Sequence, residues 1–228
     1  MILAIESATP RGSVALVVGG SVRAEGLLLP GPRASGSYLS ATEALFAAAG
    51  ATTGDVSAVA VSAGPGAFTG LRVGMSAAKG FCFGWGVPLV PVPTLLALAH
   101  RFPGEGRIVC PVLDARRGEV YAGLFRWDGG ELASLSPDMA IAPGLLPGRI
   151  PDGDVLLCGD GVPPYEALFR EALGDRATLA LGDEGLPRAA TVGIVGERIF
   201  RGGGAEDPRA AVPFYLRPSG VESLRPRP

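Results

Sequence analysis

The stretch Ser62-Ala-Gly-Pro-Gly-Ala-Phe-Thr-Gly-Leu-Arg72 constrains the fold of this chain more than any other segment. It follows an apolar run over residues 56–62, which predicts a strand, and it opens a pattern of small and apolar residues over 67–82, which predicts a helix. A glycine-rich turn between a strand and a helix exposes backbone N–H groups at the positive end of the helix, where an anion can bind. The segment therefore indicates an α/β fold with a candidate anion site.

Two interpretations of this turn stay open. In the first, Gly64, Gly66 and Thr69 contact a phosphate group. In the second, Gly64 and Gly66 only shape the turn, while Gly70 and Gly74 let the helix pack closely on a neighbour. The segment is not a P-loop, because no Gly-Lys-Ser/Thr follows, and it departs from the dinucleotide-binding spacing at Thr69.

The chain around this segment predicts two similar halves. The first half predicts strands at 2–5, 13–18, 21–26 and 87–92, a helix over 37–49, and a helix that Thr94 caps and that reaches His100. The second half predicts strands at 107–113, 119–126, 155–157 and 213–217, helices over 164–173 and 190–200, a loop over 137–151 and a frayed tail over 218–228. We place the boundary between the two lobes at residues 102 and 103.

A repeated set of turn residues suggests that one lobe is a duplicate of the other. Each half has an acidic residue closing a first strand, an Arg-Gly turn and a Gly-Gly hairpin tip: Glu6, Arg11–Gly12 and Gly19–Gly20, then Asp114, Arg117–Gly118 and Gly129–Gly130. An ordinary antiparallel meander would also place turn residues in this way. We favour duplication, because a hairpin does not require the acid at the strand end.

Composition excludes several classes of function. The formal charge is −2 and Lys79 is the only lysine, which argues against a direct nucleic-acid interface. Three scattered cysteines predict reduced thiols and a cytoplasmic protein. Prolines and glycines interrupt the uncharged run over 80–100, so we expect no membrane span there.

Few residues offer chemistry. His100 is the only histidine, so neither a zinc site of ordinary spacing nor a Ser-His-Asp system can be built, and we predict no catalytic residue and no metal site. Glu6 and Asp114 could face each other across a cleft and hold Mg²⁺, or each could accept hydrogen bonds from its own turn. Arg116 could meet a phosphate or pair with Asp114. The helix over 68–82 could pack on its own sheet and also present an apolar face to a partner.

Four motifs resemble the TsaB (YeaZ) family in order and spacing: Met1-Ile-Leu-Ala-Ile-Glu-Ser-Ala-Thr9, Gly64-Pro-Gly-Ala-Phe-Thr-Gly-Leu-Arg-Val-Gly74, Leu113-Asp-Ala-Arg-Arg-Gly-Glu-Val-Tyr121 and Pro213-Phe-Tyr-Leu-Arg217. The resemblance implies an actin/Hsp70/sugar-kinase-like (ASKHA) fold of two duplicated lobes, each a mixed sheet with helices. It also implies a cytoplasmic role in forming N6-threonylcarbamoyladenosine at position 37 of tRNAs that read codons beginning with A.

The same resemblance implies a non-catalytic scaffold that activates a TsaD-type paralogue, with a TsaE-type ATPase as a further partner. The chain would form a homodimer when alone and meet tRNA only through the complex. It would bind no cofactor alone, with ATP or ADP and Mg²⁺ possible at the junction with the partner. The helices of the first lobe would make the partner interface, here Tyr38, Thr42, Leu45, Phe68, Leu71, Arg72 and Met75. Met75→Glu or Leu45→Glu would then abolish association and leave the fold intact.

Two departures from the family pattern concern the first lobe. Glu6-Ser7 stands where the family has Asp-Thr, and residues 33–36 lack the histidine that members often carry before the first helix. Two other functions stay open. One is a small ATP-dependent kinase of the same superfold, with Glu6 or Asp114 in a catalytic role and Gly64, Gly66, Thr69, Asp114 and Arg116 near the nucleotide. The other is a direct tRNA-binding module.

Overall fold

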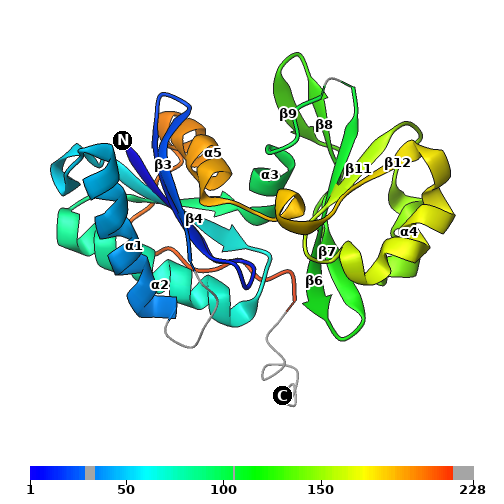
Figure 1. The fold of residues 1–228 in the computed structure, drawn as a ribbon, viewed down its shortest axis with the longest axis horizontal. Coiled ribbons are helices and arrows are strands. Elements are labelled where there is room, and N and C mark those ends of the chain that lie inside the picture. Colours follow the sequence, from blue (N-terminus) through cyan, green and yellow to red (C-terminus); the bar gives the residue numbers. More distant parts are fainter. Residues whose placement is uncertain (29–33, 105, 218–228) are drawn as a thin grey trace, which may run out of the picture.

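A computed structural model of the protein describes residues 1–28, 34–104 and 106–217, and these residues form two lobes (Figure 1). Each lobe has a mixed β-sheet with helices against it, as an ASKHA-like fold requires. The tail over 218–228, which we predicted to be frayed, lies outside the described residues. Within the described part, no helix is long and apolar enough to cross a membrane.

The first sheet has the strand order β3-β2-β1-β4-β5. Its strands are β1 (Ile2–Glu6), β2 (Ser13–Val18), β3 (Ser21–Leu27), β4 (Ala58–Gly64) and β5 (Leu89–Pro93). The first three strands form an antiparallel meander, and β4 and β5 run parallel to β1. Strands β1 and β4 are buried along their whole length, which explains their continuous apolar sequence.

Helices cover both faces of this sheet. On one face, α1 (Ala34–Ala49) and α2 (Phe68–Trp85) enclose a core that includes Leu3, Ile5 and Val59. On the other face, α5 (Ala189–Arg201) packs on the alternate residues of the same strands, including Ile2, Ala4 and Ala60. A short helix, α3 (Thr94–Ala99), leads into the second lobe and contributes Leu95 and Leu98 to its core.

The second sheet repeats the order of the first as β10-β7-β6-β11-β12, with β8 and β9 attached beside β6. Its strands are β6 (Ile108–Arg116), β7 (Glu119–Ala122), β8 (Phe125–Asp128), β9 (Glu131–Ser134), β10 (Met139–Ile141), β11 (Val155–Cys158) and β12 (Ala177–Ala180). Helix α4 (Glu166–Leu173) covers one face. Six short 3-10 helices complete the described elements: Thr53–Asp55, Pro143–Leu145, Pro147–Arg149, Pro163–Tyr165, Gly174–Arg176 and Gly182–Gly185.

The matching strand orders confirm the predicted duplication, and the Gly-Gly tips correspond. Gly19–Gly20 joins β2 to β3, Gly129–Gly130 joins β8 to β9, and all four glycines have left-handed φ angles. The acids do not correspond. In the first lobe, Glu6 pairs with Ser13, which lies six positions before the hairpin glycine Gly19. In the second lobe, the residue six positions before the hairpin glycine Gly129 is Gly123. The N–H of Gly123 donates to the carbonyl of Pro111. The position equivalent to Glu6 is thus Pro111, and Asp114 lies three residues further along β6.

Several predicted elements need correction. The strand predicted over 119–126 is interrupted between β7 and β8, and the loop predicted over 137–151 contains β10. Residues 213–217 form no strand, although the Phe214 N–H donates to the Ala63 carbonyl at 2.7 Å. Thr94 is the first residue of α3 rather than its cap, and its hydroxyl accepts a hydrogen bond from the Gly64 N–H at 3.1 Å.

Helix α5 lies in the part of the chain that we assigned to the second lobe, yet it packs on the first sheet (Figure 1). Gly193 and Gly196 permit the close approach, since a Cβ at either position would overlap Val17 or Ala60. At the far end of the helix, the Glu197 carboxylate accepts hydrogen bonds from the N–H groups of Gly19 and Gly20. The predicted boundary at 102/103 therefore places residues 189–201 in the second lobe, whereas they pack on the sheet of the first lobe.

Candidate functional site

The two lobes meet at a cavity of about 400 Å³ that contains most of the predicted anion-binding residues. The first lobe contributes the turn after β1 and the start of α2, and the second lobe contributes the end of β6 and the loop after β11. The residues lining it are Ala8, Pro10, Gly66, Ala67, Phe68, Thr69, Leu113, Asp114, Ala115, Arg116, Tyr121 and Asp160. Gly66, Thr69, Asp114 and Arg116 are thus brought together, whereas Gly64 lines a different cavity.

The glycines of the first-lobe turn serve close packing. A Cβ on Gly66 would lie 2.6 Å from the Cβ of Ala8, and a Cβ on Gly70 would lie 2.1 Å from the carbonyl oxygen of Ser7. The N–H of Gly64 donates to the Thr94 hydroxyl, and the N–H of Ala67 donates to the Ala8 carbonyl at 2.7 Å. These contacts favour the packing interpretation, because donors engaged within the chain are not available to a phosphate.

Glu6 lies beneath the cavity and does not line it. Its side chain is fully buried, and Oε1 accepts a hydrogen bond from the Ala8 N–H at 2.6 Å. Burial raises the pKa of this carboxyl group to about 7, although hydrogen bonds from Ala8, Ser62 and Thr9 oppose the shift. Glu6 therefore caps its own turn, and the geometry does not place it with Asp114 around a shared metal ion.

On the second-lobe side, the charged residues already pair with one another. The Arg116 guanidinium lies 3.0 Å from Asp114 Oδ2, and the Arg116 N–H donates to Asp114 Oδ1 at 2.7 Å. Asp160 accepts a hydrogen bond from the Asp114 N–H at 3.0 Å, and burial raises the pKa of its carboxyl group. Two carboxylates and one neutralised arginine make this cavity a poor site for a free phosphate, so the phosphate role of Gly66, Thr69, Asp114 and Arg116 stays a prediction.

Other reactive groups are embedded in the core. Cys82, Cys110 and Cys158 are buried and free, and burial raises the pKa of the Cys82 thiol to about 11, so it is not a thiolate at neutral pH. Burial also lowers the pKa of His100, which packs edge-on against Trp127. Among the described residues, no group of His, Cys, Asp or Glu is arranged to hold a metal ion.

Most of the residues that we predicted at a partner interface lie inside the first lobe. Five of them are no more than 5% exposed: Tyr38, Thr42, Leu45, Leu71 and Met75. Little of these side chains is left for a partner to contact, so their role at an interface stays a prediction. The apolar stripe of each helix faces its own sheet, because that stripe encloses the core around β1 and β4.

Phe68 and Arg72 are the two predicted interface residues that reach the surface. The Arg72 guanidinium lies 3.7 Å from the centre of the Phe68 ring, and its Nε donates to the Tyr215 hydroxyl at 3.3 Å. The rings of Phe68 and Tyr215 are 5.2 Å apart. Sequence analysis did not identify Tyr215 as a member of this group, although it lies in one of the four quoted motifs.

Comparisons with known proteins agree on the family and the fold. The family model described as TsaD, tRNA N6-adenosine threonylcarbamoyltransferase, matches residues 35–222. The tRNA threonylcarbamoyladenosine biosynthesis protein TsaB of Escherichia coli (strain K12) is 30% identical over 222 residues, covering 95% of this chain and 94% of that protein.

Solved structures give the same picture. YeaZ from Pseudomonas aeruginosa superposes with a TM-score of 0.78 at 26% identity, covering 94% of this chain and 99% of the other. An inorganic polyphosphate/ATP-glucomannokinase from Arthrobacter sp. strain KM gives a TM-score of 0.50 at 13% identity, covering 88% and 98%, which is a likeness of fold alone.

Proposed function

Since the chain belongs to the TsaB (YeaZ) family, we propose that it acts in the biosynthesis of tRNA threonylcarbamoyladenosine. Its finer role is that of a non-catalytic scaffold, which binds and activates a TsaD-type transferase in the cytoplasm. The modified nucleoside is N6-threonylcarbamoyladenosine at position 37 of tRNAs that read codons beginning with A.

The scaffold role is supported chiefly by how the acidic and basic side chains in and beneath the inter-lobe cavity are paired. Within the cavity Arg116 pairs with Asp114, and beneath it Glu6 is fully buried with Oε1 bonded to the Ala8 N–H, so neither acid is presented freely to a substrate. A kinase needs donors aimed at phosphate and carboxylates that hold Mg²⁺. The interior of this cavity therefore argues against phosphoryl transfer by this chain alone.

The partner surface that we propose is the outer side of α1 and α2, which lie side by side at the edge of the first lobe in Figure 1. The exposed residues of these helices include Leu39, Glu43, Ala44, Ala47, Phe68, Arg72, Ser76 and Phe83. Exposed Phe and Arg side chains, here Phe68, Phe83 and Arg72, are of the types enriched at protein interfaces. We call this set the α1–α2 surface.

The partners follow from the family. A TsaD-type transferase would occupy the α1–α2 surface in the complex, and a second copy of this chain would occupy it when the chain is alone. A TsaE-type ATPase would join the pair, with ATP or ADP and Mg²⁺ at the junction rather than in this chain by itself. Transfer RNA would be contacted through the complex only, in keeping with the formal charge of −2.

Size-exclusion chromatography with light scattering tests this proposal, using the chain alone and mixed with the TsaD-type transferase of the same source. We expect a homodimer that gives way to a heterodimer. Arg72→Glu and Phe83→Asp should each weaken the heterodimer by about thirtyfold, the effect of losing roughly 2 kcal/mol at an interface hot spot. Arg149→Glu, an exposed change in the second lobe, is the matched control and should associate normally.

Two results would contradict the scaffold role. Normal association of both Arg72→Glu and Phe83→Asp would remove the α1–α2 surface from the interface. Failure to bind the transferase, together with saturable ATP binding by the chain alone, would favour a small ATP-dependent kinase of the ASKHA superfold. Binding of tRNA by the chain alone, with steep salt dependence, would favour the nucleic-acid module.

A further inference from the structure

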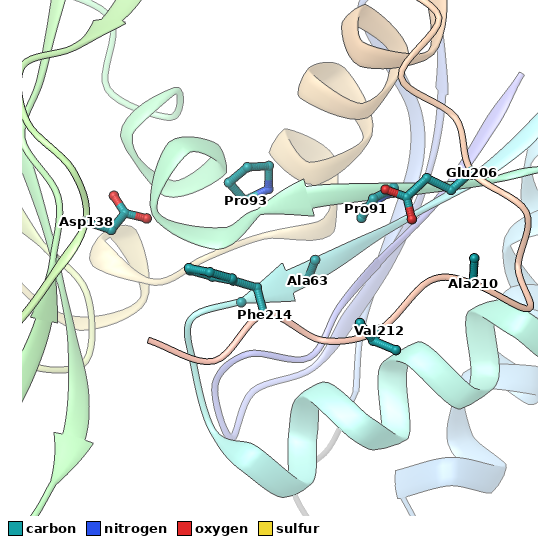
Figure 2. A pocket seen from close by; sticks show the side chains of 9 residues that line it. Ala63, Pro91, Pro93, Asp138, Glu206, Ala210, Val212 and Phe214 are labelled. Carbon is teal, nitrogen blue, oxygen red and sulfur yellow. The ribbon is translucent and has the colours of Figure 1, made fainter. Parts of the chain in front are cut away.

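A second cavity, of about 460 Å³, is lined by Gly64 and by a set of residues that does not line the inter-lobe cavity (Figure 2). Strand β5, the end of β4 and the segment 206–214 form its walls, and Asp138 reaches it from the second lobe. The residues lining it are Ala63, Gly64, Pro91, Pro93, Asp138, Glu206, Ala210, Val212 and Phe214.

The walls are apolar and the two charged residues are at opposite ends. Figure 2 shows the Asp138 carboxylate beyond Pro93 at one end and the Glu206 carboxylate beside Pro91 at the other. The ring of Phe214 lies between them, with Ala63 on its Pro91 side. A ligand that fills this space therefore needs an apolar middle and two polar ends.

The cavity offers hydrogen-bond acceptors and almost no donors. Pro91 and Pro93 have no N–H group. The N–H groups of four further lining residues donate within the chain. Gly64 donates to Thr94 Oγ1, and Glu206 donates to the Leu89 carbonyl. Ala210 donates to the Asp207 carbonyl, and Phe214 donates to the Ala63 carbonyl. No lysine, arginine, histidine or hydroxyl side chain is among the described lining residues. The ligand must therefore supply the donors.

The carboxylates are also without a counter-charge. In the described part of the chain, no hydrogen bond or ion pair reaches the side chain of Asp138 or Glu206. Asp138 is half-buried, and burial alone raises the pKa of its carboxyl group to about 6. A bound cation would offset the free energy that this desolvation costs.

We propose that this cavity binds a linear aliphatic diamine, with one ammonium group on the Asp138 carboxylate and the other on the Glu206 carboxylate. The methylene chain would lie along Pro91, Pro93 and Phe214. Each ammonium group brings three N–H donors, which matches a cavity whose polar side chains are both acceptors. Two charged hydrogen-bonded ends fix the length of the ligand, so one chain length should bind best.

Isothermal titration calorimetry of the full chain with α,ω-diamines of increasing length tests the proposal. We expect saturable 1:1 binding with a preferred length. The diol of that length, which lacks charge, and the monoamine, which reaches one carboxylate only, should each bind at least about tenfold more weakly. No saturable binding by any diamine would overturn the proposal, as would a monoamine that binds as well as the diamine.

Variants locate the site. Asp138→Asn and Glu206→Gln should each weaken the preferred diamine by about tenfold or more, because each removes one charged hydrogen-bonded end. Glu131→Gln, an exposed carboxylate in the β8–β9 hairpin, is the matched control and should bind normally. Ala210→Trp fills the cavity without changing its charge and should abolish binding, so the site stays testable even where a charge variant fails to fold. Unchanged binding in all three cavity variants would place the diamine elsewhere.

Discussion

The two lobes share a backbone and differ in what surrounds it. Gly64 after β4 and Gly159 after β11 have φ angles of +123° and +114°, so the duplicated turn kept the same unusual conformation. In the second lobe, the carbonyl of Val112 from the same sheet packs against Gly159. In the first lobe, the carbonyl of Phe214 from the far end of the chain packs against Gly64. The two glycines thus have similar φ angles, but the carbonyl group that packs against each comes from a different part of the chain.

The acids near the two turns diverged further. Glu6 is sealed under α2 and bonded to its own turn, whereas Asp114 lies on an extended part of β6, is 33% exposed and pairs with Arg116. The first lobe therefore depends on burial at this end and the second lobe on surface charge. This difference predicts how variants of the two lobes should rank in stability.

The largest loss should come from a charge placed beneath α2. Met75 is 3% exposed, so Met75→Glu buries a carboxylate without a partner and should lower the free energy of unfolding by about 4 kcal/mol or more. This replaces our sequence-based expectation that the fold would survive, and it applies equally to Leu45→Glu. Urea denaturation measures the effect, and the exposed neighbour Ser76→Glu should change stability by less than about 0.5 kcal/mol. A wild-type midpoint for Met75→Glu would mean that α2 does not pack as described.

The next largest effects should separate the two glycines. Gly159→Ala places a Cβ 2.0 Å from the Val112 oxygen in a central strand, and should cost about 3 kcal/mol. Gly64→Ala places a Cβ 2.1 Å from the Phe214 oxygen, in a segment that can move aside, and should cost about 2 kcal/mol. Gly130 has a φ of +82°, and a Cβ added there would meet no atom within 4 Å. Gly130→Ala therefore measures the cost of the left-handed backbone conformation alone, which should be about 1 kcal/mol. The reverse order for Gly64 and Gly159 would make the C-terminal segment the more rigid neighbour.

The pH dependence of stability should distinguish the buried acid Glu6 from the partly exposed acid Asp114. The folded chain holds the Glu6 proton up to a pKa of about 7, whereas the ordinary value of 4.5 applies when the chain is unfolded. This contribution to stability is therefore complete below about pH 4.5 and is lost as the pH rises through 7. Between pH 5 and pH 8 wild type should lose about 2 kcal/mol relative to Glu6→Gln. The raised pKa of Asp138 occurs in both proteins and cancels in the difference. Parallel pH profiles for the two proteins would show that Glu6 is already ionised in the fold.

The smallest effect should come from the acid of the second lobe. Asp114→Asn removes an ion pair with Arg116, whose side chain is 74% exposed, and such pairs contribute less than about 1 kcal/mol. The Asn carbonyl can still accept the Arg116 N–H. Thermal unfolding at low and high salt checks this expectation. A large loss that salt does not reduce would show that Asp114 has a buried structural role.

Local patterns predicted the elements that are long or sharply bounded. The Gly-Gly tips, α2 and the central strands were predicted because turn glycines and continuous apolar runs act within a few residues. Strands β10 and β12 were missed because they are short and only half-buried, so neither strict alternation nor a full apolar run marks them. The position of α5 depends on a face of the first sheet formed more than a hundred residues earlier, which no local pattern encodes.

Local patterns also limited what could be predicted about the site. The spacing of Leu71 and Met75 shows that one face of α2 is apolar, but it does not show whether that face meets a partner or the lobe's own sheet. Gly66, Thr69 and Asp114 were predicted as candidate phosphate-binding residues and line one cavity, but their binding role stays a prediction. The second cavity could not be predicted, because Asp138 and Glu206 come from segments without a recognisable pattern and are assembled by tertiary packing alone.

The return of α5 to the first sheet also governs how this protein can be made in the cell. A ribosome that has completed only the first hundred residues has produced all five strands of the first sheet, but not the helix that covers Ile2, Ala4 and Ala60. That apolar face stays open until residue 201 has left the exit tunnel, by which time the whole second lobe has emerged. Nascent chains therefore carry an aggregation-prone surface for nearly half of their synthesis. A premature stop before residue 189 should yield insoluble protein rather than a functional N-terminal lobe.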